Sequence, residues 1–107
     1  NLMRRMCPAY DGGQWKYFEL SNGARYMTPP DSSGELVLFK NERNYFEDNI
    51  SADAAGMIVT LLGLSHLGSA VYEQDEELAN ELFDNFHKLR DFALQHPESS
   101  AIFRAIV

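Results

Sequence analysis

The feature that most constrains the fold of this chain is a long segment without charge. Residues 54–72 contain no Asp, Glu, Lys or Arg and are rich in Ala, Leu and Val. Just before them, Ser51 is a favourable N-cap, and Asp53 falls in the first turn, where the positive end of a helix favours a carboxylate. We therefore predict a helix that begins after Ser51 and is apolar on all sides, as the central helix of a packed domain must be.

The same segment is long enough to cross a bilayer, so a membrane span is the alternative interpretation. Its polar content argues against a span, and its glycines lack the G-x-x-x-G spacing of associating membrane helices. We favour the packed domain and expect no membrane contact. The residues that carry this argument are Gly56, Thr60, Gly63, Ser65, His66, Gly68 and Ser69.

A second strong local signal predicts a β-hairpin. The aromatic-rich run from Gln14 to Leu20 is typical of a strand. Asn22 and Gly23 follow, and both tolerate the positive φ that a two-residue type I′ turn requires. The run from Ala24 to Thr28 then returns, and Pro29-Pro30 ends the pairing because proline has no N–H to donate.

A two-residue turn would also define the register of this hairpin. Phe18 would lie opposite Met27, and Glu19 would lie opposite Tyr26. Because side chains alternate along a strand, the hairpin would have a core face and an amphipathic outer face. The predicted core face holds Phe18, Leu20 and Met27, and the predicted outer face holds Trp15, Tyr17, Glu19 and Tyr26.

The remaining segments complete an α+β pattern. Residues 35–40 and 45–47 predict two further strands in an antiparallel meander. Residues 76–95 predict an amphipathic helix, with Leu78, Leu82, Phe86, Leu89 and Ala93 at helical spacing. Pro97 then introduces a short closing helix that holds Ala101, Ile102, Ala105 and Ile106. We predict one domain over residues 1–107, in which a small antiparallel sheet of three or four strands packs against a buried apolar helix and an amphipathic helix.

Several functional classes find no support in this sequence. The net charge of −7 repels nucleic-acid phosphates, so general nucleic-acid binding is not expected. Cys7 is the single cysteine, which excludes an intramolecular disulfide. His66, His87 and His96 lie outside any metal-binding or catalytic spacing, and no phosphate-binding loop is present. We expect no enzyme, no metal, no cofactor and no small-molecule substrate.

Two surface features remain as candidates for binding. The first is one face of the hairpin, whose aromatic rings are able to stack on bases: Trp15, Tyr17 and Tyr26. Nucleic-acid binding also needs adjacent cations. We therefore favour the interpretation that another element of the fold covers these rings. The second feature is an acidic run without a basic residue inside it. The simpler explanation of this acidic run is a solvated helix start. The functional explanation is a contact surface for a basic partner. The run consists of Glu73, Asp75, Glu76, Glu77, Glu81 and Asp84.

Three segments of the chain form a distinctive set. The first is the hairpin from Tyr10 to Pro29, with its tyrosine, glycine and tryptophan lead-in and its L-S-N-G turn followed by Tyr-Met-x-Pro. The second is the S-A-D-A-A-G helix start at Ser51–Gly56. The third is His96-Pro97-Glu98 with the segment from Ala101 to Ile106. Together, in this order, they resemble the ArdB/KlcA antirestriction proteins. Within this resemblance we assign architectural roles to Trp15, Asn22, Gly23, Ser51 and Asp53. From the resemblance we expect that the N-terminal segment normally carried by the family is missing from residues 1–107, and we expect an acidic residue where the chain has Val107.

The resemblance implies a function that the residues alone do not. Members of this family are carried by plasmids and other mobile elements of bacteria, act in the cytoplasm and alleviate type I restriction of incoming unmodified DNA, without being enzymes. The partner would be the type I system or an associated host factor, reached directly or indirectly. Because the acid is concentrated in one run and diluted by nine basic residues, we do not expect an extended DNA mimic. The alternative is a small nucleic-acid-binding or oligomeric interaction module without antirestriction activity.

Overall fold

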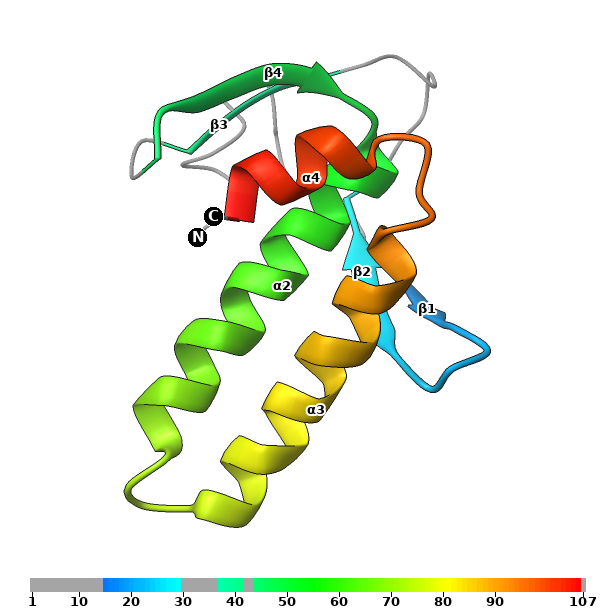
Figure 1. Ribbon diagram of the computed structural model, residues 1–107. Coiled ribbons are helices and arrows are strands. Elements are labelled where there is room, and N and C mark those ends of the chain that lie inside the picture. Colours follow the sequence, from blue (N-terminus) through cyan, green and yellow to red (C-terminus); the bar gives the residue numbers. More distant parts are fainter. Residues whose placement is uncertain (1–14, 30–36, 42–43, 107) are drawn as a thin grey trace.

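The structure, a computed structural model, describes residues 15–29, 37–41 and 44–106. It confirms an α+β fold (Figure 1). The predictions made for Cys7, for residues 30–36 and for Val107 lie outside the described residues. In chain order the described elements are β1 (Lys16–Glu19), β2 (Arg25–Thr28), β3 (Val37–Asn41), β4 (Phe46–Ile50), α2 (Ala52–Val71), α3 (Glu76–Ala93) and α4 (Ser99–Ile106).

Helix α2 is the central element, and it packs against β2, α3 and α4. It begins after Ser51, whose Oγ accepts the Ala54 N–H at 3.1 Å and so satisfies one of the unpaired amides of the first turn. Its buried residues include Met57, Ile58 and Leu61. Around them gather Phe39, Phe46 and Ile50 of the second hairpin, Leu89 of α3 and Ile102 of α4.

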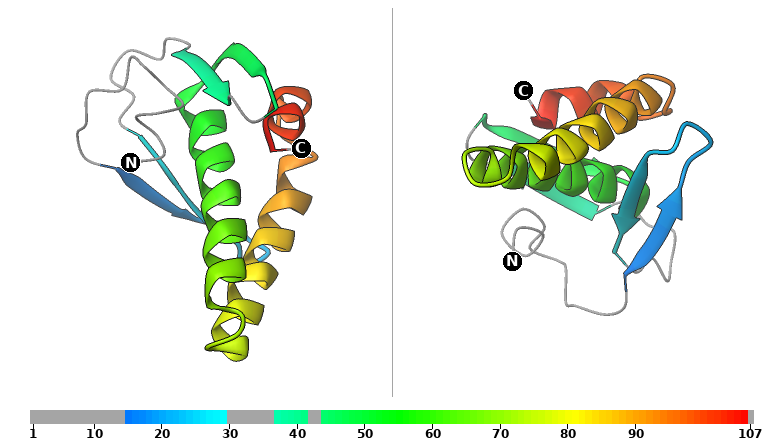
Figure 2. Two further views of the ribbon diagram at one scale, coloured as in Figure 1. Left: turned by 90° about the vertical axis from the view of Figure 1, so that its left-hand side faces the viewer. Right: turned by 90° about the horizontal axis from the view of Figure 1, so that it is seen from below.

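The burial of α2 is uneven along its length. Most buried residues lie in its first half, whereas His66, Leu67, Ser69 and Ala70 are exposed. The buried helix predicted from the sequence is therefore buried mainly in its first half, and in its second half α3 is its neighbour among the described elements (Figure 2). By length and composition α2 also meets the criteria for a membrane-crossing helix.

The first hairpin has a three-residue loop, so the predicted register is wrong by one residue. Phe18 lies opposite Tyr26, and Glu19 lies opposite Arg25. The Gly23 N–H donates to the Leu20 carbonyl at 2.9 Å, and Gly23 has a φ of 88°. This is the geometry of a three-residue loop that ends in a left-handed residue.

The one-residue shift exchanges the faces of β2. Ala24, Tyr26 and Thr28 are buried, and their face is shared by Phe18, which stacks on the Tyr26 ring at a centroid distance of 5.4 Å. Met27 lies on the opposite face and Phe18 is 42% exposed, so the predicted place of both residues in the core is wrong.

The other two strands form a second, separate hairpin in the described part of the chain, rather than a continuation of one meander. Strand β4 begins at Phe46, one residue later than predicted, because Tyr45 has a positive φ of 59° in the turn before it. The Nδ2 atoms of Asn41 and Asn44 donate to the Ala105 carbonyl at 2.8 and 2.9 Å. These bonds satisfy a backbone acceptor in the last turn of α4 and dock that helix on the second hairpin.

The amphipathic pattern of α3 is confirmed in its C-terminal part. Leu89 and Ala93 are fully buried, whereas Leu78 at the start of the helix is 39% exposed. The helix begins after Asp75, whose Oδ1 accepts the Leu78 N–H at 3.0 Å. The closing helix is also confirmed as α4, with Ala101, Ile102 and Ala105 buried.

Candidate functional site

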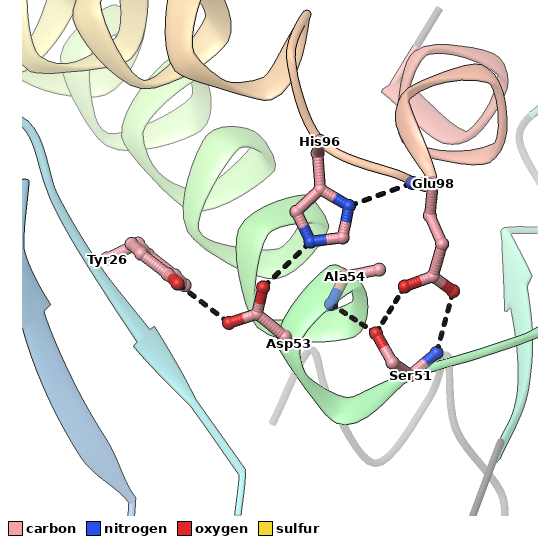
Figure 3. Close-up of polar contacts among 6 residues, drawn as sticks. All are labelled: Tyr26, Ser51, Asp53, Ala54, His96 and Glu98. Carbon is pink, nitrogen blue, oxygen red and sulfur yellow. Dashed lines mark hydrogen bonds and ion pairs between the residues drawn. The ribbon is translucent and has the colours of Figure 1, made fainter.

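A polar network lies at the N-terminal end of α2, where β2 and the segment between α3 and α4 converge (Figure 3). We call it the α2 network. Asp53 is its centre: Oδ1 accepts the Tyr26 hydroxyl at 2.7 Å, and Oδ2 lies 2.8 Å from Nε2 of His96. The members are Tyr26, Ser51, Asp53, His96 and Glu98.

The hydrogen bonds of His96 define its tautomer. Its Nδ1 accepts the Glu98 N–H at 2.9 Å, so in the neutral ring the proton resides on Nε2, which donates to Asp53. The His96 side chain is only 9% exposed, against 43% for Asp53. Both ring nitrogens are therefore occupied, and the imidazole has no nitrogen left to activate a substrate or bind a metal.

Glu98 makes the second half of the network. Its Oε1 accepts the Ser51 N–H at 2.9 Å, and its Oε2 accepts the Ser51 hydroxyl in a short hydrogen bond. Ser51 thus caps α2 with its oxygen while its own N–H and O–H are held by a carboxylate from the segment before α4. This reciprocal arrangement resembles a capping box in which the acid comes from a distant part of the chain instead of the same helix.

The environment of the network affects the titration of Tyr26. Burial raises the pKa of the Tyr26 hydroxyl, and the hydrogen bond and negative charge of Asp53 raise it further. The phenol therefore stays protonated and serves as a hydrogen-bond donor. It is a poor general base or nucleophile in this position.

The arrangement supports a structural role better than a catalytic one. The Ser51 hydroxyl donates to a carboxylate rather than to an imidazole, so the network lacks the nucleophile–base pair that acyl transfer requires. Among the described residues, no group of three His, Cys, Asp or Glu side chains is placed to hold a metal ion. The network joins β2, α2 and the start of α4 into one rigid unit.

Sequence reasoning identified Ser51 and Asp53 but missed their partners Tyr26, His96 and Glu98. One signal in the sequence could have indicated these partners. All five residues belong to the three segments on which the family resemblance rests. Residues from separate segments that share one hydrogen-bond network need to occur together, because removing one leaves its partner without a bond.

Asn22 and Gly23 lie where the first hairpin meets α3. Nδ2 of Asn22 donates to the Lys88 carbonyl at 3.0 Å, and its Oδ1 accepts the Ala24 N–H at 2.9 Å. On α3, Asn85 accepts the Arg25 N–H at 2.9 Å and donates to the Arg25 carbonyl at 3.1 Å. The two asparagines thus dock the hairpin on α3, a contact that the sequence did not indicate.

The three aromatic residues proposed as a base-stacking face do not lie together. Tyr26 is buried in the core, Tyr17 is 80% exposed, and Trp15 is partly buried against the core. The register places Tyr17 opposite Met27 and on the other face of the hairpin from Tyr26. The predicted shared face of Trp15, Tyr17 and Tyr26 is therefore wrong.

The acidic run lies at the turn between α2 and α3 and along the first part of α3, and all of its members are exposed. Asp75 is the N-cap of α3, and Asp84 lies 3.1 Å from the Lys88 ammonium. Glu73, Glu76, Glu77 and Glu81 complete the run. None of these carboxylates belongs to the α2 network.

Residues 8–107 match the model of the antirestriction protein family, and the chain belongs to that family. The antirestriction protein KlcA of Escherichia coli is 40% identical over 104 residues, which cover 97% of this chain and 70% of KlcA. A second KlcA from the same species is 41% identical over 97% of this chain and 68% of its own length.

A solved structure extends the likeness to three dimensions. It is described as showing that KlcA and ArdB have a novel fold and antirestriction activity against type I DNA restriction systems in vivo but not in vitro. The match has a TM-score of 0.83 and 41% sequence identity, and it covers 98% of this chain and 71% of that one. The fold described above is therefore the fold of that structure.

Proposed function

We propose that this protein alleviates the restriction of unmodified DNA by type I restriction–modification systems in bacteria, and that it does so in the cytoplasm without catalysing a reaction. Membership of the antirestriction family carries the first part of the proposal. The second part is supported by the α2 network, in which the hydroxyl, imidazole and carboxylate groups bond to one another.

The surface charge favours a protein partner over imitation of a DNA duplex. A DNA mimic needs carboxylates spread evenly over an extended face, whereas here six exposed acids lie in one part of the chain. We propose that the protein acts through a local contact with the type I system or with an associated host factor. The behaviour described for KlcA and ArdB, activity in vivo but not in vitro, favours a host factor and an indirect route.

The test is the plating efficiency of unmodified phage on a host with a type I restriction system, with and without the protein expressed from its full-length gene. An isogenic host that lacks the restriction system is the control. We expect plating to rise only in the restricting host. Unchanged plating, with the protein shown to be folded and abundant, would refute the proposal.

A second measurement separates the direct from the indirect route. The purified protein is added to a purified type I restriction enzyme that cleaves unmodified DNA. An indirect route predicts unchanged cleavage. Inhibition at concentrations comparable to those of the enzyme would instead establish a direct contact.

A further inference from the structure

The end of the α2–α3 helical pair projects away from the rest of the described fold. Helices α2 and α3 run side by side, and the turn that joins them lies far from the β3–β4 hairpin and α4 in Figure 1 and in the left view of Figure 2. We call residues 67–81 the helical tip. In this region the pair is closely packed, because a Cβ on Gly68 would lie 2.6 Å from the Phe83 ring.

The helical tip exposes apolar side chains that the fold does not need for its own core. Leu67 is 51% exposed, Tyr72 is 48% exposed and Leu78 is 39% exposed. Leu67 belongs to the second half of α2, Tyr72 follows its last residue, and Leu78 lies in the first turn of α3. Single exposed leucines are common on protein surfaces, but three large exposed apolar side chains at one projecting end of the fold favour an interaction site.

The other exposed side chains of the helical tip include five carboxylates, and the tip contains no Lys or Arg. Glu73, Asp75, Glu76, Glu77 and Glu81 are all exposed there. The chain contains no Lys or Arg from residue 52 to residue 87. The helical tip therefore combines exposed apolar side chains with negative charge, and apolar and polar groups also occur together at protein interfaces.

The charge decides which occupant fits this surface. A second copy of the chain docked through the same tip would bring five more carboxylates against the five already present, and like charges brought together at an interface repel one another. Nucleic acids and anionic lipid surfaces are repelled for the same reason. A protein groove with an apolar floor and Lys or Arg side chains along its edges complements both the exposed apolar side chains and the carboxylates of the helical tip.

We propose that the helical tip docks into such a groove, which is apolar at its floor and basic at its edges, on the protein through which restriction is alleviated. The inference rests on the proposed function, since it names the surface used for that contact. Leu67 and Leu78 provide the apolar anchors, and Glu76, Glu77 and Glu81 orient the approach by long-range attraction to the basic edges.

The first experiment compares matched leucine substitutions in the plating assay. The double variant Leu67→Ser, Leu78→Ser removes the apolar anchors, and Leu94→Ser is the control, because Leu94 is 63% exposed at the opposite end of α3. Circular dichroism and thermal unfolding verify that each variant is folded. We expect alleviation to fall about tenfold or more in the double variant, as for loss of interface anchors, and to be unchanged in the control.

The carboxylates of the helical tip are tested in the same way with neutral substitutions, which avoid placing a positive charge near the start of α3. The triple variant Glu76→Gln, Glu77→Gln, Glu81→Gln should lose most of the alleviation. Asp91→Asn, an exposed acid farther along the same helix, should lose none. Alleviation equal to wild type in both the leucine and the glutamate variants would overturn the proposal.

A second readout does not depend on antirestriction activity. A photo-crosslinking phenylalanine analogue is placed at position 67, with position 94 as the control, in the full-length protein in a restricting host. We expect a crosslink from position 67 alone to a peptide that contains Lys or Arg beside apolar residues, and we expect it to disappear in the Glu76, Glu77, Glu81 triple variant. Crosslinks to a second copy of the chain, or none, would overturn the docking proposal, whereas absence of plating alleviation by the wild type would refute the proposed function alone.

Discussion

Replacement of Gly56 by alanine tests how closely β2 is packed on α2. The same replacement at Gly63, on the same helix, is the matched control. A Cβ at position 56 would lie 2.3 Å from the Met27 carbonyl oxygen and 2.7 Å from Thr28 Cα, both backbone atoms of β2. A Cβ at position 63 would meet no described atom within 4 Å. Both variants add one methyl group to α2. Only the methyl group at position 56 would clash with backbone atoms of β2.

The expected magnitudes follow from two opposing effects. Alanine stabilises a helix interior by about 1 kcal/mol relative to glycine, at either position. At Gly63 this is the whole effect, so the free energy of unfolding should rise by roughly 0.5–1 kcal/mol. At Gly56 the β2 backbone has to move by about 1 Å to restore an ordinary contact of 3.4 Å. Overpacking of this kind costs up to about 3 kcal/mol, because backbone yields less than a side chain, so we expect a net loss of about 2 kcal/mol.

The assay is urea-induced unfolding followed by far-ultraviolet circular dichroism on the wild type, Gly56→Ala and Gly63→Ala. The difference between the two variants should be about 3 kcal/mol, the sum of the expected loss and gain. This difference does not depend on the absolute stability of the wild type. Equal stability of the two variants would refute the close approach of β2 to α2, and with it the placement of Tyr26 beside Asp53.

Three further predictions concern the hydrogen bonds that join the elements. Because the folded-state pKa of Tyr26 is raised, the stability that this residue contributes is complete below the unfolded tyrosine pKa of about 10 and is lost as the pH rises above it. The free energy of unfolding should therefore fall more steeply with rising pH in the wild type than in Tyr26→Phe. Parallel curves for the two proteins would contradict the raised pKa of Tyr26. Asn85→Ala should lower stability by about 1–2 kcal/mol and speed amide exchange in β2, whereas Asn80→Ala, an exposed change on the same helix, should do neither. Ser51→Ala should cost about 1–2 kcal/mol through the lost cap of α2, measured by thermal unfolding, and an unchanged midpoint would argue against the cap.

Local chemistry was sufficient to predict the elements and several of their ends. The N-cap at Ser51, the stop before Pro97 and the apolar spacing of residues 89 and 93 act within a few residues of chain, so their effects can be seen in the sequence. The same holds for the family resemblance, because its three motifs are contiguous runs of residues. The α+β class follows from these elements.

The register of the first hairpin shows where local reasoning failed. Asn22-Gly23 fits a two-residue turn and also the end of a three-residue loop, in which Gly23 alone has positive φ. The choice depends on which face of β2 packs better on α2. Burial of Ala24, Tyr26 and Thr28, and the bond from Tyr26 to Asp53, favour the longer loop.

The sequence by itself determined a capped apolar helix, an amphipathic partner, the first hairpin and the antirestriction family, because these depend on short-range periodicity, capping and motif order. Only the tertiary structure decided which surfaces those elements share. It brought Tyr26, Asp53 and His96 together from distant segments, and it covered the first half of α2 while leaving Leu67 at the helical tip exposed. Contacts between distant segments depend on how all the elements pack at once, and no local window of the chain contains that information.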